Sequence, residues 1–391
     1  MTEIERIEQL QAEMTNVGID ALFLRLAENV MLAAGWWVQI PGLGIAVVPR
    51  EGRPALLIPE YEAHEVSDRW TGDTLTFPAI RFDGPGAATE IPRLLGQFVA
   101  DRGLDGAAVG YEGSFESTAP AQIDGEPNAI GIPTLDLIRS AFETQQLVDA
   151  TDLLERVKSV KTSHDLEQLR ITNEVAAIGL NAFKEHALPG RTEAEIAAEA
   201  GRAIVAQGHG YRGARVVRCY PTVCSGPEAA TGWQYFRSRN RVVERDDVVM
   251  IELGTVVDGY WADHTRTVVA GTATDRQRDA FAAVLAAQEA AFAAAVPGAT
   301  GDEVDRAARA TCEAAGFEQF PHHTGHGVGF RYHEAMPWLT KGSTQVLAAD
   351  MVIVAEPGIY ADGLGGFRSE DDAFVTATGA VRLAETTYGL D

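Results

Sequence analysis

One local pattern occurs twice in this chain, and it constrains the fold more than any other sequence feature. Residues 189–195 and 297–303 both read Pro-Gly-x-Thr-x-x-Glu, at an offset of 108 positions. Thr-x-x-Glu is a capping box, in which the two side chains satisfy backbone groups of the first helical turn. The Pro-Gly pair before it ends a preceding helix. The repeat therefore predicts two similar α/β halves within one domain, each with two helices followed by strands. The predicted helices cover residues 164–187, 192–208, 275–295 and 300–316.

Upstream of the repeat, the sequence is typical of a separate α/β domain. Apolar residues at helical spacing predict an amphipathic helix over 4–17. Short apolar runs bounded by turn residues predict strands at 21–24, 45–48 and 56–58. At about 150 residues per domain, a chain of 391 residues is expected to form two or three domains. We predict an N-terminal domain over 1–148 and a second domain over 152–391.

The charge balance restricts the partners. The chain has 56 Asp and Glu against 32 Lys and Arg, which gives a formal net charge of −24. Nucleic acid and anionic membranes both attract basic surfaces, so this balance excludes them as partners. The acidic excess fits a protein kept soluble in high salt, and the scarcity of lysine also fits GC-rich coding; the sequence leaves both explanations open.

Targeting signals are not recognisable. No apolar run approaches the ~18 residues that cross a bilayer, and the charged start over residues 1–6 lacks the order of a signal peptide. Cys219, Cys224 and Cys312 are too few and too scattered for a disulfide framework. We expect a cytoplasmic protein with reduced thiols.

Two acids flank a predicted β-hairpin. Asp258-Gly259 is a strong two-residue turn signal, and with that turn Glu252 faces Thr265 while Gly254 faces Asp263. Glu252 and Asp263 then become diagonal neighbours on one face, roughly 7–8 Å apart at Cα. Two carboxylates so placed can converge on a pair of divalent ions, although exposed hairpins also carry such charges without function.

Histidines and further acids follow in the second half. Four of the nine histidines, at positions 322, 323, 326 and 333, fall within twelve positions, and glycines flank His326. Glu356 ends the apolar run 352–355, and Glu370 precedes the apolar run 373–375. A charge at the end of a buried strand is costly unless it is paired or bound to metal. Oxygen ligands with an imidazole suit Mn²⁺, Co²⁺, Fe²⁺ or Zn²⁺.

Five motifs follow one another in the second domain. They are the acid-Leu-Gly at 252–254, Asp-x-Thr-Arg-Thr at 263–267, Gly-His-Gly-x-Gly at 325–329 with His333-Glu334, Glu-Pro-Gly-Ile-Tyr at 356–360 and Arg-x-Glu-Asp at 368–371. In this order, the motifs resemble those of the pita-bread metallopeptidase family, peptidase family M24. The family includes methionine aminopeptidase, Xaa-Pro aminopeptidase, prolidase and creatinase. The motifs lie within about residues 150–391, and the extra N-terminal domain resembles the prolidase and creatinase branch. The resemblance implies a small N-terminal domain and a C-terminal pita-bread domain of two pseudo-twofold halves.

The resemblance also assigns roles. It implies two divalent ions, Mn²⁺, Co²⁺ or Zn²⁺, and five metal ligands, of which Asp263 and Glu370 would bridge the ions. The ligands are Glu252, Asp263, His326, Glu356 and Glu370. His333 and His322 would lie beside the scissile group, and Arg368 and Tyr360 would line the pocket. The expected reaction is attack of a metal-bridged hydroxide on an amide carbonyl, with Glu356 moving the proton and His333 stabilising the oxyanion.

Two positions depart from the family pattern. The metallopeptidases have Asp where this chain has Glu252, which is also a ligand but is longer by one methylene. A substrate-contacting histidine of the family is replaced by Trp233, which could fill a core or reshape the substrate pocket. The loss of that histidine argues against a creatinase-type mechanism.

Three functions stay open at this point. The first is a dinuclear metallopeptidase that cleaves Xaa-Pro dipeptides or N-terminal Xaa-Pro bonds of short peptides. The second is a non-peptidase enzyme on the same fold, such as an amidinohydrolase, an ectoine-hydrolase-like enzyme or a lyase, acting on a small metabolite. The third is a binding module without catalysis, which the complete ligand set disfavours. The resemblance also implies a homodimer.

Overall fold

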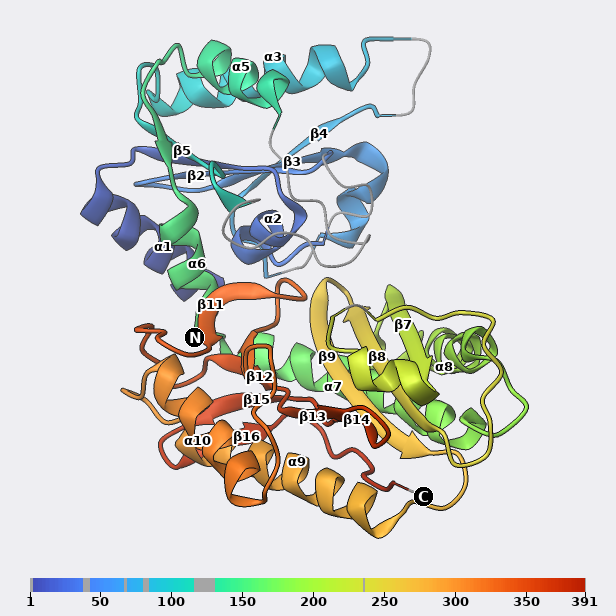
Figure 1. The fold of residues 1–391 in the computed structure, drawn as a ribbon. Helices are drawn as coiled ribbons and strands as arrows, with labels where there is room; N and C mark the ends of the chain where they lie inside the picture. Colours follow the sequence, from blue (N-terminus) through green and yellow to red (C-terminus); the bar gives the residue numbers. More distant parts are fainter. Residues whose placement is uncertain are drawn as a thin grey trace. The chain divides into compact units, whose positions relative to one another are not determined.

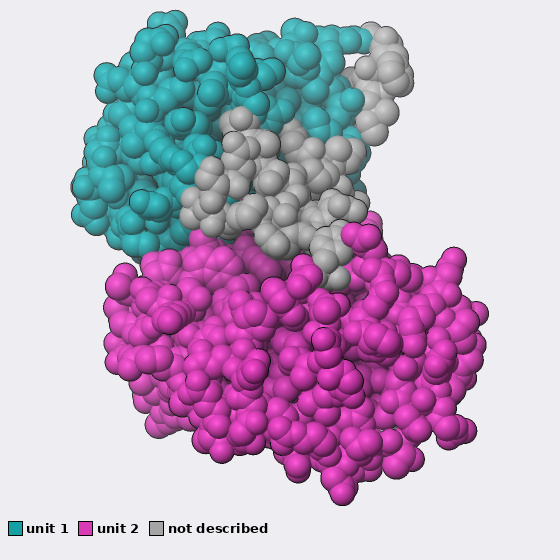
Figure 2. All heavy atoms as spheres, viewed as in Figure 1, with its two compact units in different colours: residues 1–158 teal, residues 159–391 magenta. Residues whose placement is uncertain are grey.

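A computed structural model describes residues 3–37, 43–66, 69–79, 84–115, 131–234 and 236–390. The chain divides into two compact units, residues 1–158 and residues 159–391 (Figure 2). The predicted boundary at 148–152 lies in unit 1, where Asp149 ends one strand and Thr151 begins a helix. We retain the domain limits 1–148 and 152–391 as a proposal about which segments fold independently.

Unit 1 is built on a six-stranded mixed sheet in the order β4-β3-β2-β1-β5-β6. The strands are β1 Ala21–Leu24, β2 Ile45–Pro49, β3 Ala55–Pro59, β4 Asp73–Phe77, β5 Val109–Tyr111 and β6 Leu147–Asp149. The helices are α1 Glu3–Val17, α2 Ala27–Ala34, α3 Ala87–Arg102, α5 Ile132–Ala141 and α6 Thr151–Ser159, with a 3₁₀ turn η1 at Glu60–Glu65. Helices α3 and α5 cover one face of the sheet and α1 and α2 lie on the other (Figure 1). The predicted helix and the three predicted strands are confirmed within two residues at each end.

Unit 2 contains the two predicted halves. The first half consists of α7 Ser163–His186, α8 Glu193–Gly208, η2 Tyr211–Gly213, η3 Gly226–Thr231 and the antiparallel sheet β7-β8-β9, formed by β7 Val217–Ser225, β8 Val248–Val257 and β9 Tyr260–Val269. The second half consists of α9 Asp275–Ala294, α10 Gly301–Ala314 and the sheet β11-β10-β12-β15-β16. Its strands are β10 Gly325–Gly327, β11 Glu334–Leu339, β12 Val352–Ala355, β15 Asp371–Thr376 and β16 Gly379–Arg382, with a separate hairpin of β13 Gly358–Ala361 and β14 Gly365–Arg368.

The internal repeat is visible in the backbone hydrogen bonds. In the first half Gly190 N–H donates to Val243 O, and Val243 N–H donates to Arg191 O, each at 2.8 Å. In the second half the same two bonds, at 2.9 and 2.8 Å, join Gly298 to Leu347 and Leu347 to Ala299. Both predicted capping boxes are formed, at Thr192 with Glu195 and at Thr300 with Glu303. The duplication predicted from the sequence is therefore present in the fold.

Strand alternation decides which residues face the helices. On β8, Ile251 and Leu253 pack into the apolar core shared with α7 and α8, so Glu252 lies on the opposite face. On β12, Ile353 and Ala355 pack against the core that includes α9 and α10. Each half thus buries its helices against one face of its sheet and leaves the other face for polar groups. Among the described residues, no helix combines the length and the apolar character needed to span a bilayer.

Candidate metal centre

The β8–β9 hairpin positions the first two acids. The turn residues Asp258-Gly259 have φ values of 48° and 91°, the left-handed conformation that a two-residue hairpin turn requires. The register pairs Glu252 with Thr265 and Gly254 with Asp263, as the sequence predicted. Asp263 is fully buried. The two predicted acids therefore share one face of the sheet, away from α7 and α8.

His326 on β10 presents an available nitrogen to the same place. It is fully buried, and its Nδ1 lies 2.9 Å from Gly327 O, so that Nδ1 carries the hydrogen and Nε2 keeps its lone pair. Nε2 lies 3.6 Å from Asp263 Oδ2 and 3.7 Å from Glu356 Oε1. It has no hydrogen-bond partner among the described residues. A buried imidazole nitrogen without a partner, surrounded by carboxylates, fits a divalent cation.

Glu356 and Glu370 come from the second half and complete the acidic set. Glu356 directly follows β12, and its backbone N–H donates to Thr324 O at 2.8 Å. Glu370 directly precedes β15, and its backbone N–H donates to Thr265 O at 3.2 Å. Thr265 Oγ1 also donates to Glu370 Oε2 at 2.5 Å. Thr265 thus joins the sheets of the two halves at the position where the acids meet.

Burial and mutual repulsion disfavour the charged form of these carboxylates. Burial, followed by the neighbouring carboxylates, raises the pKa of Glu370 to about 7 and raises the pKa of Glu356 well above its ordinary value. Arg368 contacts Glu252 and lies 3.7 Å from both Glu356 Oε2 and Glu370 Oε2. Tyr332 donates its hydroxyl hydrogen to Glu252 Oε1 at 2.9 Å. One guanidinium offsets only part of the charge of this acidic set, so further positive charge is favourable here.

The donors converge closely enough to share ions. Three groups each offer ligand atoms within 4.8 Å of one another: Glu252, Asp263 and Glu370; Asp263, His326 and His333; His323, His326 and Glu356. All five predicted metal ligands belong to these groups. Their carboxylate and imidazole chemistry fits divalent cations, and Asp263 belongs to two of the three groups.

His333 lies beside the centre and is held there by a buried ion pair. Its Nε2 is 3.5 Å from Asp263 Oδ2, and its ring centroid is 3.8 Å from that of His326. The next residue, Glu334, accepts a hydrogen bond from Lys161 Nζ at 2.6 Å, and both side chains are fully buried. Burial lowers the pKa of His333 well below its ordinary value, so the imidazole is neutral at neutral pH.

His322 is linked to Tyr360. Its Nδ1 lies 2.7 Å from His323 O, which makes Nδ1 the donor, and its Nε2 lies 3.0 Å from the Tyr360 hydroxyl. Burial lowers the pKa of His322 to about 3, so it too is neutral. The structure therefore brings His322 and Tyr360 together as a hydrogen-bonded pair.

Three residues of the centre were not predicted to take part in it. His323 stands in the conspicuous histidine cluster, and that cluster is the only sequence signal for it. Thr265 and Tyr332 lie inside or beside recognisable motifs but carry no signal of their own. Their contacts, to Glu370 and Glu252, join residues 105 and 80 positions apart in sequence.

The sequence pattern of metallopeptidase family M24 matches residues 167–377. The chain belongs to metallopeptidase family M24. The match covers both halves of unit 2 and all five predicted metal ligands.

Relatives of this M24 protein include named dipeptidases. It is 36% identical over 243 residues to a probable dipeptidase PepE of Mycobacterium tuberculosis, and the alignment covers 62% of each chain. It is 28% identical over 387 residues to an Xaa-Pro dipeptidase of Pyrococcus furiosus, with 99% of both chains covered. A prolidase from Pyrococcus horikoshii superimposes with a TM-score of 0.78 at 25% identity, over 99% of this chain and 100% of the other. The predicted fold, a small N-terminal domain with a C-terminal pita-bread domain, is confirmed.

The remaining predicted substrate residues of the M24 protein lie in different surroundings. Trp233 is half-buried and, with Tyr360, lines a cavity of about 520 Å³. The wall of this cavity is mixed: Phe317, Phe320 and Leu364 contribute apolar surface. Arg276, Glu318 and Gln319 contribute polar surface. Arg368 does not line this cavity, because it is buried among the carboxylates of the metal centre.

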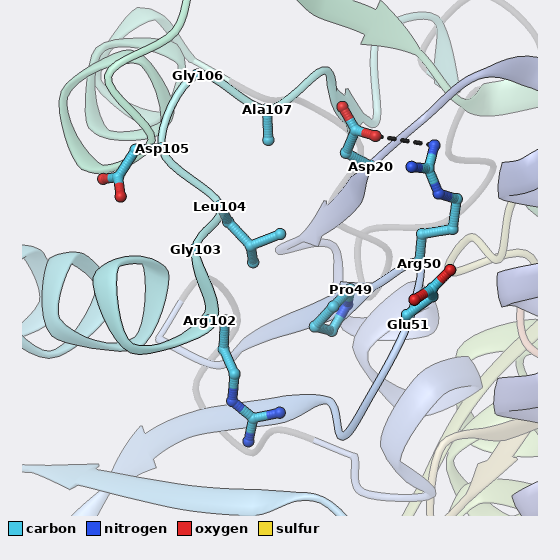
Figure 3. A pocket seen from close by; sticks show the side chains of 10 residues that line it. All are labelled: Asp20, Pro49, Arg50, Glu51, Arg102, Gly103, Leu104, Asp105, Gly106 and Ala107. Atoms are coloured by element: carbon cyan, nitrogen blue, oxygen red, sulfur yellow. Dashed lines mark ion pairs between the residues drawn. The ribbon is translucent and has the colours of Figure 1, made fainter.

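A second hollow, in unit 1, lacks the features of the metal centre. It measures about 410 Å³ and lies beside the loop after α3 (Figure 3). Asp20, one of three acids that line it, is paired with Arg50 at 2.8 Å and accepts a hydrogen bond from Ala108 N–H. Arg102, on the same wall, is paired with Asp73. The charged groups named here already have partners within the protein, so the metal centre of unit 2 is the stronger candidate site of this M24 protein.

Proposed function

We propose that this protein is a metal-dependent peptidase with two divalent ions, acting on Xaa-Pro dipeptides or on N-terminal Xaa-Pro bonds of short peptides. The observation that supports this proposal most strongly is that five possible metal ligands from both halves of unit 2 lie close together at one buried site. His326 Nε2 has no hydrogen bond there among the described residues. The full-length similarity to an Xaa-Pro dipeptidase supports the substrate class.

The proposed ligands are those predicted from the sequence. Glu252, Asp263, His326, Glu356 and Glu370 would hold the ions, with Asp263 and Glu370 shared. Bound ions would supply a water of lowered pKa and an electrophilic partner for the carbonyl oxygen. Mn²⁺, Co²⁺ and Zn²⁺ all suit this set of oxygen and nitrogen donors.

The side chains provide the proton transfers and the positioning. Glu356 would take a proton from the attacking water and return it to the leaving nitrogen. His333 is neutral and partly exposed, and it would donate to the developing oxyanion. His322 orients the Tyr360 hydroxyl, and this pair would bind the substrate near the cleaved bond.

A second candidate function is favoured by one observation. Trp233 lines a cavity of mixed aromatic and polar character beside Tyr360, whereas the family pattern has a substrate-contacting histidine at the position of Trp233. Such a cavity could select a small non-peptide amide, as in an amidinohydrolase, an ectoine-hydrolase-like enzyme or a lyase. In this second function Arg368 would pair with the carboxylates of the centre and would not contact the substrate.

Hydrolysis assays separate the two candidates. Metal-depleted protein is reloaded with Mn²⁺, Co²⁺ or Zn²⁺ and given Xaa-Pro dipeptides, matched Xaa-Ala dipeptides and a set of small amides and amidines. We expect release of proline from Xaa-Pro with at least one ion, loss of activity with a chelator, and a fall in kcat of about 10²–10⁴-fold in Glu356→Gln. Turnover of the small amides alone would support the second candidate, and metal binding without any turnover would contradict both.

Two properties of the whole protein belong to the same proposal. We infer a homodimer from the family resemblance, and light scattering on the full chain tests it by giving twice the mass of one chain. We also infer a cytoplasmic location, which is consistent with three free cysteines. Fractionation of the source cells, with detection of the full chain, tests that location.

A further inference from the structure

His323 brings a second imidazole nitrogen to the metal centre. Its Nε2 lies 2.8 Å from Glu356 Oε1, while His326 Nε2 lies 3.7 Å from the same oxygen. The Nε2 atoms of both histidines are buried and have no hydrogen bond within the described part of the chain. His323 Nε2 approaches Glu356 without the alignment of a hydrogen bond. Ligand atoms of the three side chains lie within 4.8 Å of one another.

The surroundings hold the His323 ring in this position. Its centroid lies 4.8 Å from the Trp338 ring, and its own carbonyl accepts the Nδ1 hydrogen of His322. Arg309 fixes the preceding loop by donating to Phe320 O at 2.6 Å and to His322 O at 2.5 Å. A histidine that served only to fill space would not be expected to have its loop tied down while its buried Nε2 lies against a carboxylate without a hydrogen bond.

We propose that His323 is a further metal ligand, which gives the ion held by His326 and Glu356 a second imidazole. This inference rests on the proposed metal-dependent function and extends it to metal preference. Imidazole ligands favour Zn²⁺, Co²⁺ and Fe²⁺, whereas carboxylate-rich sets suit Mn²⁺. His323 therefore shifts the selectivity of the centre away from Mn²⁺.

X-ray absorption spectroscopy on the full chain loaded with one equivalent of Zn²⁺ tests the assignment. The outer-shell scattering of imidazole rings counts the histidines bound to the ion. We expect two imidazoles in the wild type and one in both His323→Ala and His323→Gln. His333→Ala is measured alongside because His333 also lies near His326, and it is expected to retain two.

Metal affinity gives an independent readout. Competition with a chromophoric chelator should show Zn²⁺ and Co²⁺ binding weakened about tenfold or more in His323→Ala, with Mn²⁺ changed much less. His209→Ala, which removes an exposed histidine at the end of α8, is the control for adventitious binding and should match the wild type. Circular dichroism confirms that each variant is folded before it is measured.

Different results would contradict the assignment of His323 as a ligand and the proposed metal-dependent function. A wild type that binds ions through one imidazole, or a His323→Ala variant that keeps two, would overturn the assignment of His323 and leave the proposed function intact. A wild type that binds none of Zn²⁺, Co²⁺ and Mn²⁺ would overturn the proposed function together with this assignment.

Discussion

At the scale of single residues, Glu252 serves two purposes. Tyr332 donates to one of its carboxylate oxygens and Arg368 contacts the other. Its ligand atoms also lie within 4.8 Å of those of Asp263 and Glu370, so under the proposed function these three residues would hold an ion together. The additional methylene of Glu, compared with Asp in the family pattern, would let one side chain contact Arg368 and also bind an ion.

Substitution of Glu252 should change the number of bound ions. In Glu252→Gln the charged ligand is lost and Arg368 loses an ionic partner, so we expect the metal content to fall from two ions to one per chain. Glu252→Asp keeps the charge and should retain two ions with altered affinity for one. Elemental analysis after gel filtration gives the stoichiometry. Glu185→Gln, at an exposed position of α7, is the control, and two ions in Glu252→Gln would contradict the proposed role.

At the scale of secondary-structure elements, the β8–β9 hairpin determines where Asp263 lies. Its turn depends on Asp258 and Gly259, which both have positive φ. Asp258 also accepts hydrogen bonds from Val216 N–H at 2.9 Å and Arg215 N–H at 3.1 Å, which anchor the turn to the chain before β7. A shift of one residue in the pairing would move Asp263 to the helix-facing side of the sheet.

Replacement of Gly259 should therefore destabilise unit 2. A Cβ atom is strained at a φ of 91°, so we expect Gly259→Ala to lower the free energy of unfolding by about 1–2 kcal/mol. Urea unfolding measures this change. Gly201→Ala is the matched control in the same unit, because a Cβ there meets only ordinary contacts inside helix α8, and it should be neutral or slightly stabilising. Equal effects of the two substitutions would show that the turn conformation is unimportant.

Helix α2 depends on a carboxylate from another element. Leu26 at its N-cap has no capping side chain, and Glu112, after β5, accepts from Leu26 N–H at 3.0 Å and from Arg25 N–H at 2.9 Å. Asn29 Nδ2 donates to the same carboxylate at 2.8 Å. Burial raises the pKa of Glu112 from 4.5 to about 7.

This raised pKa predicts a pH-dependent contribution to stability. Between about pH 4.5 and pH 7 the folded state holds the Glu112 proton more tightly than the unfolded state, so its contribution is present at low pH and is lost as pH rises. Glu112→Gln does not titrate and loses acceptor capacity, so it should be less stable by about 1–3 kcal/mol at pH 5. Urea unfolding of both proteins at pH 5, 6, 7 and 8 should show this difference shrinking towards pH 7. A difference that grows with pH would contradict the sign.

At the scale of the whole molecule, the acidic residues fall into two groups: a few buried carboxylates at the proposed metal centre, and the many others that produce the net negative charge. The net charge of −24 comes from 56 acids against 32 basic residues, and only four of those acids are proposed ligands. Most of the excess is therefore unrelated to the metal centre and is screened by salt. The buried carboxylates of the centre are screened much less and respond to bound cations instead.

Metal ions should therefore stabilise the protein beyond the effect of ionic strength. At a concentration 100 times the Kd, an ion that binds only the folded state adds about 2.7 kcal/mol, so Tm should rise with Mn²⁺, Co²⁺ or Zn²⁺ and fall with a chelator. Calorimetry with NaCl at matched ionic strength controls for screening of the surface charge. Asp263→Asn, which removes a shared ligand, should lose most of the response; an equal rise in Tm with NaCl alone would attribute the effect to the surface.

The sequence by itself determined the features that depend on neighbours in the chain. Capping boxes, the Asp258-Gly259 turn and the apolar runs are local, so they predicted the helices, the repeat and the pairing of Glu252 with Thr265. The family motifs then pointed to the five ligands, and the structure brings these side chains together in one place.

Only the tertiary structure decided which other groups meet there. The burial of Arg368 among carboxylates, the approach of His323 to Glu356 and the support of the His333 segment by Lys161 join positions far apart in the chain. Such contacts follow from how the two halves pack, since side-chain direction and burial depend on the whole core rather than on local spacing. For the same reason, Trp233 could be noticed in the sequence, but its place on the wall of a cavity with Tyr360 could not be predicted.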